Sequence, residues 1–371
     1  MVSQRNGALR MIKIFMCIPS LASAGAERFV TELACNLDRT KYEPIVVVTN
    51  ILSQGSSFYQ KLLQEKISIY DVSDKNYFCE VSNMIRLLRK EKPDIIHSNV
   101  GALLHVLLPV VLYGKCRAHL FTVHSMGYRI FSGMKKRLVS FCFRRRKVIP
   151  VAISDTVRQS VVDAYKIPKD NIELVYNGVD TQHFNCVERL LKSTVTIITT
   201  GTLYHIKNHE LLIDAFEKAQ QKLPNLRLVI VGDGKLRNNL EDKVNELELQ
   251  DKVLFAGNQR DVCKFLNEAD IYCCTSKVEG LPIAVLEAMA CGLPIITTPA
   301  GGVVDIVQEE ENGFIVNYDA ECISKKMVEL ASDEALRHEM GNASRSIALK
   351  RDISVCAREY ETLYEKYYKG I

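Results

Sequence analysis

The residues of this chain whose types and positions suggest chemistry are Glu279, Glu287, Lys207 and His124. The two glutamates are separated by seven residues inside the stretch 276–302, which reads SKVEGLPIAVLEAMACGLPIITTPAGG. Carboxylates repel a phosphate but accept hydrogen bonds from hydroxyl groups, so this pair is suited to hold the hydroxyls of a sugar and a ribose. The pair alone leaves open a second interpretation, in which Glu279 caps a helix and Glu287 is solvated.

The elements around the two glutamates predict an anion-binding turn. Residues 269–274 form a short apolar strand, Glu279-Gly280 forms a turn, and apolar residues recur with helical spacing from Ile283 onward. Pro282 is expected at the first helical position, where its missing N–H costs nothing. A helix N-terminus has unpaired N–H groups and a positive dipole end, so this turn is suited to hold a phosphate.

The string EGLPIAVLE, the following ACGLPIITT and the pair Gly301-Gly302 resemble the signature of the family 4 glycosyltransferases, which are retaining enzymes of the GT-B fold. The resemblance is to the bacterial type that serves polysaccharide and glycoconjugate synthesis. It implies that Glu279 holds the hydroxyls of the donor sugar in a catalytic role and that Glu287 holds the ribose diol. It further implies that the donor diphosphate lies on the turn and helix start, formed by Gly280, Leu281, Pro282 and Ile283.

The second half of the chain carries further matches to this family. In GTLYHIKN, Gly201 and Lys207 fit a pattern of Gly-Arg-Leu followed by a lysine that enters a helix. The resemblance implies that Lys207 is a catalytic cation on the donor diphosphate. Thr202 stands at the arginine position, which leaves the site one charge short unless His205 compensates. Asn258 lies where the backbone of the family contacts the nucleotide base.

The first half of the chain contributes a small-residue loop and a histidine. In PSLASAGAERF, Gly25 precedes an expected helix, and a glycine lets the backbone approach a ligand closely. Ala26-Glu27-Arg28 fits the same position in the family, which implies donor binding at Gly25. In FTVHS, His124 ends a predicted strand and resembles the family's acceptor-side histidine, a catalytic role. His97 also ends a strand, and we interpret it as structural.

Alternating strand and helix patterns predict α/β domains with parallel sheets. A length of 371 residues suits two domains of ordinary size. The resemblance implies two doubly wound Rossmann-like domains that face a central cleft, with a C-terminal helix returning to the first domain. The expected divisions are a flexible extension over 1–10, an acceptor-side domain over 11–185, a linker over 186–194, a donor domain over 195–351 and the returning helix over 352–371.

Composition narrows the class of protein. The chain is 47% hydrophobic and 25% charged, and its net charge of +4 is too weak to indicate a nucleic-acid partner. Twelve cysteines without a C-x-x-C pair predict reduced thiols in a cytoplasmic protein. Apolar runs all fall short of the ~20 residues of a membrane-spanning helix. Since the sequence has no D-x-D run and a nucleotide sugar is a co-substrate, we expect no metal and no cofactor.

A basic segment runs from Arg129 to Lys147 and reads RIFSGMKKRLVSFCFRRRK. Its mixture of basic and aromatic residues is typical of a membrane-surface helix or of a nucleic-acid patch. The remaining interpretation is a packed helix with a solvated basic edge. We predict that this segment makes a peripheral contact with the anionic inner face of the cytoplasmic membrane, where a lipid-linked acceptor would be found.

The resulting prediction is a retaining glycosyltransferase that moves a hexosyl or N-acetylhexosaminyl group from a UDP-sugar, favoured over a GDP-sugar, to a glycan or lipid-linked acceptor. An obvious enzyme nucleophile is missing from the sequence motifs, so attack from the same face is expected. Two rivals remain, a nucleotide-sugar epimerase of related two-domain fold and a non-catalytic GT-B scaffold that binds a partner protein. The sequence leaves the donor sugar, the acceptor, the linkage and the oligomeric state open.

Overall fold

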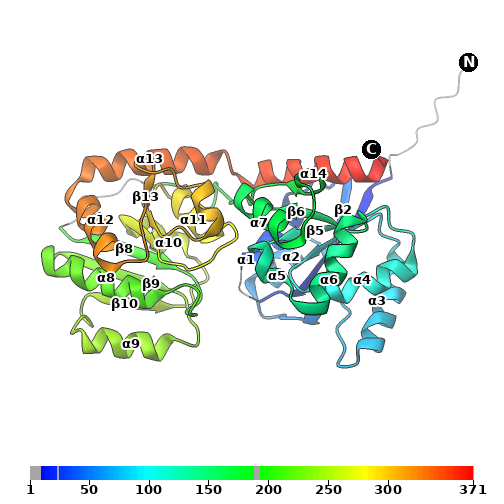
Figure 1. Cartoon of the computed structure of the whole chain (residues 1–371), viewed down its shortest axis with the longest axis horizontal. Coiled ribbons are helices and arrows are strands. Elements are labelled where there is room, and N and C mark those ends of the chain that lie inside the picture. Colours follow the sequence, from blue (N-terminus) through cyan, green and yellow to red (C-terminus); the bar gives the residue numbers. More distant parts are fainter. Residues whose placement is uncertain (1–9, 23–24, 188–192, 371) are drawn as a thin grey trace, which may run out of the picture. The chain divides into compact units, whose positions relative to one another are not determined.

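The protein is described by a computed structural model over residues 10–22, 25–187 and 193–370 (Figure 1). Most of the expected N-terminal extension, the loop residues Ser23 and Ala24 and the centre of the expected linker lie outside these ranges. The chain forms two compact units. The first contains the described residues up to Ile153, residues 158–175 and those from Cys356 onward, and the second contains residues 154–157 and 176–355.

The first unit is built on a parallel sheet. Over the described ranges this sheet has seven strands in the order β3-β2-β1-β4-β5-β6-β7, and every neighbouring pair is parallel. Its central strands β1 and β4 are largely buried, as a parallel sheet with helices on both faces requires, although β4 ends in the polar residues His97, Ser98 and Asn99. The strands are β1 (Ile12–Ser20), β2 (Tyr42–Ile51), β3 (Ser68–Asp71), β4 (Ile95–Asn99), β5 (Ala118–Val123), β6 (Ile149–Ala152) and β7 (Glu173–Leu174).

The helices of the first unit cover both faces of this sheet. The strand order reverses between β1 and β4, so right-handed crossovers place α1 and α2 on one face and α3, α4, α6 and α7 on the other. The helices are α1 (Gly25–Asn36), α2 (Ser57–Gln64), α3 (Tyr77–Glu91), α4 (Ala102–Tyr113), α5 (Gly127–Ile130), α6 (Gly133–Arg144), α7 (Asp155–Tyr165) and the 3₁₀ turn η1 (Lys169–Asn171).

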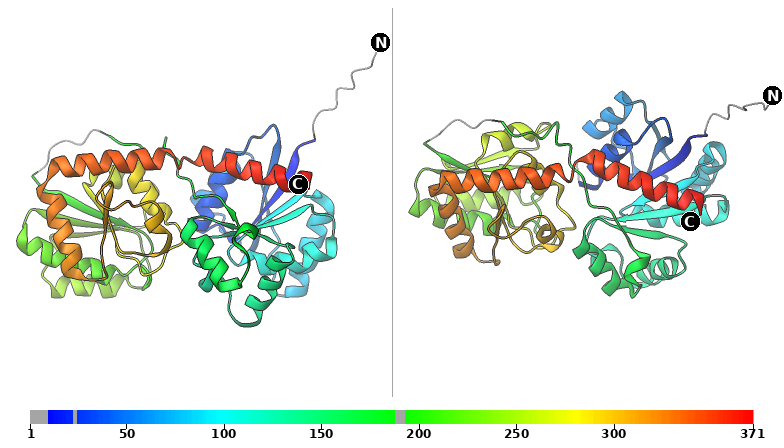
Figure 2. Two further views of the ribbon diagram at one scale, coloured as in Figure 1. Left: turned by 45° about the horizontal axis from the view of Figure 1, so that its top comes forward. Right: turned by 90° about the horizontal axis from the view of Figure 1, so that it is seen from above.

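The C-terminal helix α14 (Ile353–Lys369) packs on the first unit from Cys356 onward, which confirms the predicted return (Figure 2). Tyr360 and Tyr364 are fully buried there. The Tyr364 hydroxyl lies 2.7 Å from His97 Nδ1, and the Tyr360 hydroxyl lies 2.8 Å from Thr122 Oγ1. Two buried tyrosines that find hydrogen-bond partners on the sheet anchor this helix. No helix within the described ranges is long and apolar enough to cross a membrane.

The second unit repeats the same plan. Over its described residues it has a six-stranded sheet in the order β10-β9-β8-β11-β12-β13, again parallel. The strands are β8 (Val195–Thr200), β9 (Leu226–Val231), β10 (Val253–Gly257), β11 (Ile271–Cys274), β12 (Ile295–Thr297) and β13 (Gly313–Ile315). The helices are α8 (His209–Lys222), α9 (Arg237–Glu246), α10 (Cys263–Glu268), α11 (Ile283–Ala290), η2 (Gly301–Asp305), α12 (Ala320–Ser332) and α13 (Glu334–Leu349).

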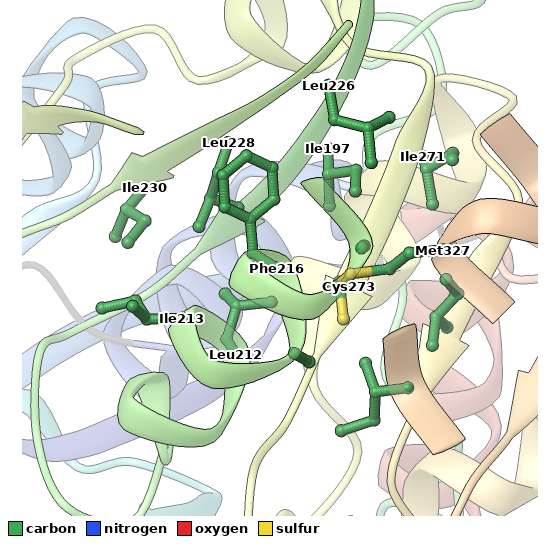
Figure 3. Packing of buried hydrophobic residues seen from close by; sticks show 14 of the residues in the cluster. Ile197, Leu212, Ile213, Phe216, Leu226, Leu228, Ile230, Ile271, Cys273 and Met327 are labelled. Atoms are coloured by element: carbon green, nitrogen blue, oxygen red, sulfur yellow. The ribbon is translucent and has the colours of Figure 1, made fainter. Parts of the chain in front are cut away.

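A large apolar core of the second unit lies between its sheet and the helices α8, α9 and α12. Figure 3 shows Phe216 of α8 against the strands of the sheet, close to Leu228. Leu212 and Phe216 are fully buried and lie four residues apart, so they share one helix face. This apolar packing fixes the start of α8, and therefore also fixes the turn that precedes it.

The segment after β7 packs with the second unit, although we had expected the first domain to extend to residue 185. Val179 N–H donates to the carbonyl of Arg351 (2.9 Å), and Thr181 Oγ1 donates to the Asp352 carboxylate (2.6 Å). Arg345 donates to the carbonyl of Phe184 (2.8 Å). Residues 176–184 find their hydrogen bonds around α13, and this explains their place in the second unit.

Candidate functional site

Each unit gathers polar residues where its strand order reverses. In the first unit this point lies between β1 and β4, and in the second between β8 and β11. Open α/β sheets bind ligands at the carboxyl ends of the strands at such a switch point. The structure brings most of the predicted residues to these two places. Gly25 and His124 lie in the first unit, and Gly201, Thr202, Lys207, Glu279, Gly280, Leu281, Pro282, Ile283 and Glu287 lie in the second.

Lys207 and Glu279 form an ion pair in the second unit. The Nζ atom lies 2.7 Å from Glu279 Oε1, and the two side chains are 23% and 13% exposed. Burial lowers the pKa of the Lys207 ammonium, but the neighbouring Glu279 carboxylate outweighs this effect and the net pKa is raised. A permanently charged lysine therefore stands beside a carboxylate in a largely water-excluded place.

The turn that carries Lys207 is fixed by the end of β11. Thr275 Oγ1 donates to the carbonyls of Lys207 (3.2 Å) and Asn208 (3.0 Å). Lys277 N–H donates to the carbonyl of Ile206 (2.8 Å). These bonds join the two segments on either side of the switch point, so the lysine and Glu279 are positioned as one group.

Gly201 lies in contact distance of the lysine side chain and has a backbone conformation that favours glycine. Its φ is +149°, and a Cβ atom at this position would lie 3.5 Å from Lys207 Cε. Thr202, which stands in the place of the family's arginine, is partly buried, and its carbonyl accepts the N–H of Tyr204 (2.9 Å). His205 is exposed, so its ring is accessible to a ligand. Lys207 is thus the cation that the structure places directly at Gly201.

Helix α11 begins one residue later than expected. Pro282 is its N-cap residue, with extended backbone (φ −72°, ψ 111°), so the prediction that it is the first helical residue is wrong by one position. Its carbonyl already accepts the N–H groups of Val285 (3.1 Å) and Leu286 (3.3 Å), which is the half-helical role of an N-cap. Within the described ranges, α11 lacks a side-chain cap. Because Pro282 has no N–H, the backbone donors of this segment are Gly280, Leu281 and Ile283.

Two contacts orient the turn before α11. Asn177 Nδ2 donates to the carbonyl of Leu281 (3.1 Å). A Cβ on Gly302 would lie 1.9 Å from the carbonyl oxygen of Gly280, so this oxygen occupies the space that only a glycine leaves. The C=O and N–H groups of a trans peptide point in opposite directions, so the Leu281 N–H points away from Gly302. The orientation of the turn is therefore fixed by these two contacts.

Glu287 and Asn258 differ in their surroundings. Glu287 lies in the second turn of α11 and is only 4% exposed, so the interpretation of a solvated glutamate is wrong. Glu287 is therefore enclosed within the second unit and does not lie on its surface. Asn258 is exposed and follows β10, which lies two strands from β8 in the sheet. The structure thus does not bring Asn258 into contact with the Lys207 group.

The first unit contributes His124, which directly follows β5 and is half-buried. Its Nε2 lies 2.9 Å from Asn99 Oδ1, and the ring of Phe29 meets it edge-on with centroids 5.0 Å apart. Burial lowers the pKa of His124 to about 3, so the imidazole is neutral at physiological pH. Gly25 is exposed at the first position of α1, and a Cβ there would meet nothing within 4 Å in the described structure.

His97 confirms its structural interpretation. It is 0% exposed, its Nδ1 lies 2.7 Å from the Tyr364 hydroxyl, and its Nε2 lies 2.7 Å from Thr122 Oγ1. Burial lowers its pKa to about 3. With both ring nitrogens bonded inside the first unit, His97 anchors helix α14 and leaves no atom for a ligand.

Sequence reasoning assigned no site role to two asparagines, Asn99 beside His124 and Asn177 beside Leu281, although Asn177 belongs to an Asn-Gly-Val-Asp turn that resembles the family. Asn99 is the last residue of β4, and a polar residue at the end of a buried strand was the available signal. Asn177 stands more than a hundred residues from Leu281 in the chain. A hydrogen bond between residues so far apart in the chain cannot be predicted from a local sequence pattern.

Two doubly wound parallel sheets, each with polar residues at its switch point, are the architecture of the GT-B fold. The family model for Glycosyltransferase Family 4 matches residues 23–183, and the model for Glycosyl transferases group 1 matches residues 187–347. Together they span nearly the whole chain, and the chain belongs to the family 4 glycosyltransferases.

Relatives extend over most of the chain. The N-acetyl-alpha-D-glucosaminyl L-malate synthase of Bacillus anthracis is 24% identical over 94% of this chain and 95% of its own. A UDP-Gal:alpha-D-GlcNAc-diphosphoundecaprenol alpha-1,3-galactosyltransferase of Escherichia coli is 24% identical over 68% and 70%. The Anabaena protein HepE, solved with UDP and glucose, superposes with a TM-score of 0.83 at 19% identity, over 95% of this chain and 100% of HepE. This likeness supports the GT-B fold.

Proposed function

We propose that this glycosyltransferase takes a sugar from a nucleotide-sugar donor and keeps its anomeric configuration. The observation that carries the proposal is the Lys207–Glu279 pair beside the start of α11. Breaking a sugar–phosphate bond builds negative charge on the leaving diphosphate. A fixed cation and a helix N-terminus stabilise that charge as it develops, and such preorganised groups are worth about 3–4 kcal/mol each. Lys207 and the donors of Gly280, Leu281 and Ile283 supply them.

Each of the other site residues binds one of the remaining parts of the donor. Glu279 holds hydroxyls of the transferred sugar, and the buried Glu287 holds the ribose diol. Gly201, Thr202 and Pro282 line the diphosphate. Asn258 lies two strands from β8, about 10 Å at ordinary strand spacing, which suits the base end of an extended nucleotide. Gly25, the first residue of α1, is the donor-binding residue that we assign to the first unit.

A UDP-sugar is the favoured donor, with a GDP-sugar as the alternative. HepE, which shares the fold, was solved with UDP. Retention follows from attack on the face that the diphosphate leaves, because Glu279, the carboxylate at the site, is tied to Lys207 and is poorly placed to form a covalent intermediate. His124 orients the sugar or the attacking acceptor. The reaction needs neither a metal nor a cofactor in this scheme.

The acceptor is a glycan or a lipid-linked sugar, as in bacterial polysaccharide and glycoconjugate synthesis. The Escherichia coli relative acts on a diphosphoundecaprenol-linked sugar. A lipid-linked acceptor requires contact with a membrane, and the first unit carries a surface suited to it. Residues 95–154 contain ten Lys/Arg and no Asp/Glu, whereas the whole chain has 48 and 44. This segregation of charge favours an anionic bilayer as the partner.

Helix α6 is the centre of this surface. Met134, Leu138 and Phe141 are exposed along one face, and Met134 is 84% exposed. Val139, Cys142 and Phe143 are buried on the other face, so the helix is anchored while its outer face stays apolar. The basic residues Lys135, Arg137, Arg144, Arg145, Arg146 and Lys147 are exposed beside it. An apolar face with a basic border is typical of an interfacial helix.

Helix α4 extends the same surface. Right-handed crossovers place α4 and α6 on the same face of the sheet, and Leu108, Val111 and Leu112 of α4 are exposed. A groove of about 390 Å³ between α6 and the end of α7 is lined by Lys136, Arg144 and Lys166. These cations suit the phosphate of a lipid headgroup. We therefore propose that the protein docks on the inner face of the cytoplasmic membrane through α4 and α6.

Donor binding and turnover test the proposed function. The protein is screened with UDP, GDP and their sugars for protection against thermal unfolding, since a ligand at 100 times its Kd adds about 2.7 kcal/mol. We expect protection by one nucleotide and transfer of its sugar with the configuration kept. Conversion of the sugar nucleotide without an acceptor would indicate an epimerase. Binding without any turnover would indicate a scaffold.

Co-sedimentation with vesicles tests the membrane surface. Vesicles with about one third anionic phospholipid should retain the protein at low salt, and purely zwitterionic vesicles should not. Replacing Arg144, Arg145, Arg146 and Lys147 with glutamine should abolish retention. A matched variant with Lys218, Lys222, Lys325 and Lys326 replaced has the same net charge and should still bind. Wild-type protein that stays in the supernatant would reduce the segment to a solvated helix edge.

A further inference from the structure

The amide of Asn99 has a fixed orientation. Asn99 is 0% exposed at the end of β4. Its Nδ2 faces two backbone carbonyls, those of Cys17 (3.3 Å) and His97 (3.4 Å). A carbonyl oxygen can only accept a hydrogen bond, so the nitrogen of the amide must point to these groups and its oxygen must point away. The oxygen that remains is the atom that faces His124.

This orientation determines the tautomer of His124. Asn99 Oδ1 lies 2.9 Å from His124 Nε2 and has no proton to give, so Nε2 carries the proton and donates it to the amide oxygen. In a neutral imidazole the other nitrogen then has a free lone pair. Among the described residues no hydrogen bond to His124 Nδ1 is found. This nitrogen can only accept a hydrogen bond.

The surroundings keep the ring neutral. Phe29 of α1 presents an aromatic edge, and the titratable neighbour on β4 is His97, which is itself neutral. Glu27 is the carboxylate of α1 nearest in sequence to Phe29, and its Oε1 accepts a hydrogen bond from Ser20 Oγ (3.1 Å). Burial lowers the pKa of His124 to about 3. A carboxylate partner in place of Asn99 would instead favour the charged ring, so the choice of an amide is chemically meaningful.

We propose that Asn99 is a positioning residue, which holds His124 as the neutral Nε2–H tautomer so that Nδ1 accepts a hydrogen bond from a hydroxyl of the bound sugar or acceptor. This inference rests on the proposed function for its ligand, but the tautomer itself does not depend on it. A ligand that replaces that hydroxyl with hydrogen or with a methyl ether leaves the nitrogen unpaired. Sites built for one hydroxyl discriminate strongly against analogues that lack it.

The first test measures the tautomer without any substrate. Nitrogen chemical shifts of ¹⁵N-histidine distinguish protonated from unprotonated ring nitrogens, and the signal of His124 is assigned as the one lost in His124→Gln. We expect Nε2 to be protonated and Nδ1 to be bare from pH 6 to 8. The opposite tautomer, or a doubly protonated ring, would overturn the proposal even if the enzyme transfers sugar normally.

The second test uses the pH profile of kcat/KM. In Asn99→Asp the carboxylate raises the pKa of His124, so below that pKa the ring is charged and Nδ1 becomes a donor. Activity should fall by about ten-fold near pH 6 and recover as the pH rises, whereas wild type shows no such ionisation. Asn99→Ala should lose about ten-fold at every pH, because the tautomer is no longer held.

Ser98→Ala is the matched control. It removes the partner of another buried histidine, His119, whose Nε2 lies 2.8 Å from Ser98 Oγ, one residue earlier on the same strand. This variant should lose stability but keep the wild-type pH profile. A profile of Asn99→Asp that matches wild type would refute the positioning role while leaving the proposed function intact. A wild-type enzyme that transfers no sugar would refute the proposed function and leave the tautomer to the first test.

Discussion

The second unit positions its site residues through charge, whereas the first unit positions His124 through neutral hydrogen bonds. Lys207 is held 2.7 Å from a carboxylate that raises its pKa, while His124 is held 2.9 Å from an amide and has its pKa lowered by burial. A leaving diphosphate requires a fixed charge, and a hydroxyl requires only an oriented acceptor. The same doubly wound sheet thus supports two kinds of electrostatics, because the residues at its switch point differ.

Among the substitutions that test this difference between the two units, Glu279→Ala is expected to have the largest effect on activity. It removes the contact that we propose with the reacting sugar and also removes the carboxylate partner of Lys207, so kcat should fall by about 10²–10³. Turnover of the preferred nucleotide sugar measures the loss. Glu321→Ala is the control, since it breaks an exposed pair with Lys222 (2.8 Å) in the same unit and should leave kcat unchanged. Normal turnover in Glu279→Ala would remove that carboxylate from the mechanism.

In the first unit, His124→Ala should lower activity by about 10²-fold with little change in Tm. The ring lies at a strand end, and among the described residues only its Nε2 makes a hydrogen bond, so folding depends little on it. Differential scanning fluorimetry and an activity assay together measure the outcome. His119→Ala is the matched control and should do the reverse, because His119 is 4% exposed and bonded inside the sheet. A large loss of stability with activity retained would return His124 to a structural role.

The buried histidines should make the fold sensitive to acid. The pKa values of His97 and His119 are lowered to about 3 by burial, so between about pH 6.5 and 3 the unfolded chain binds more protons than the folded one. The free energy of unfolding therefore falls as the pH drops, by about 2 kcal/mol for each histidine at pH 5. Urea unfolding at pH 7 and pH 5 measures this. His119→Gln should show a correspondingly smaller loss, and an unchanged pH dependence would contradict the assignment.

The smallest effect is expected for Glu287→Ala. Since Glu287 is assigned to the ribose and not to the reacting sugar, its loss should weaken the binding of the nucleotide by about ten-fold and change kcat less. Isothermal titration with the nucleotide that protects the wild type gives the Kd. Equal affinity in wild type and variant would exclude the ribose role and leave Glu287 as a buried structural carboxylate.

Local patterns in the sequence were sufficient to predict the fold class and the segment that carries Glu279, its turn and helix α11. Glu279, Glu287 and the turn between them lie within nine residues, so spacing alone shows that they share a helix start. The alternation of strand and helix patterns likewise predicts a parallel sheet, because two parallel strands must be joined by a crossover, which is usually a helix. The exposed side of α6 was visible only as a basic run. Its apolar stripe became clear when Phe131 and Phe143 proved to be buried and Phe141 exposed.

Tertiary structure alone decided how the site residues are held. Lys207 and Glu279 are 72 residues apart in sequence, Asn177 and Leu281 are 104 apart, and Asn99 and His124 are 25 apart. Sheet order brings the first and the third pair together, since β11 lies beside β8 and β5 lies beside β4. Asn177 reaches Leu281 because the segment after β7 packs with the second unit. The charge state of Lys207 and the tautomer of His124 depend on these neighbours and on the water that they exclude. The types of the residues determine which chemical groups are present. The packing of distant strands determines the protonation states and the orientations of those groups.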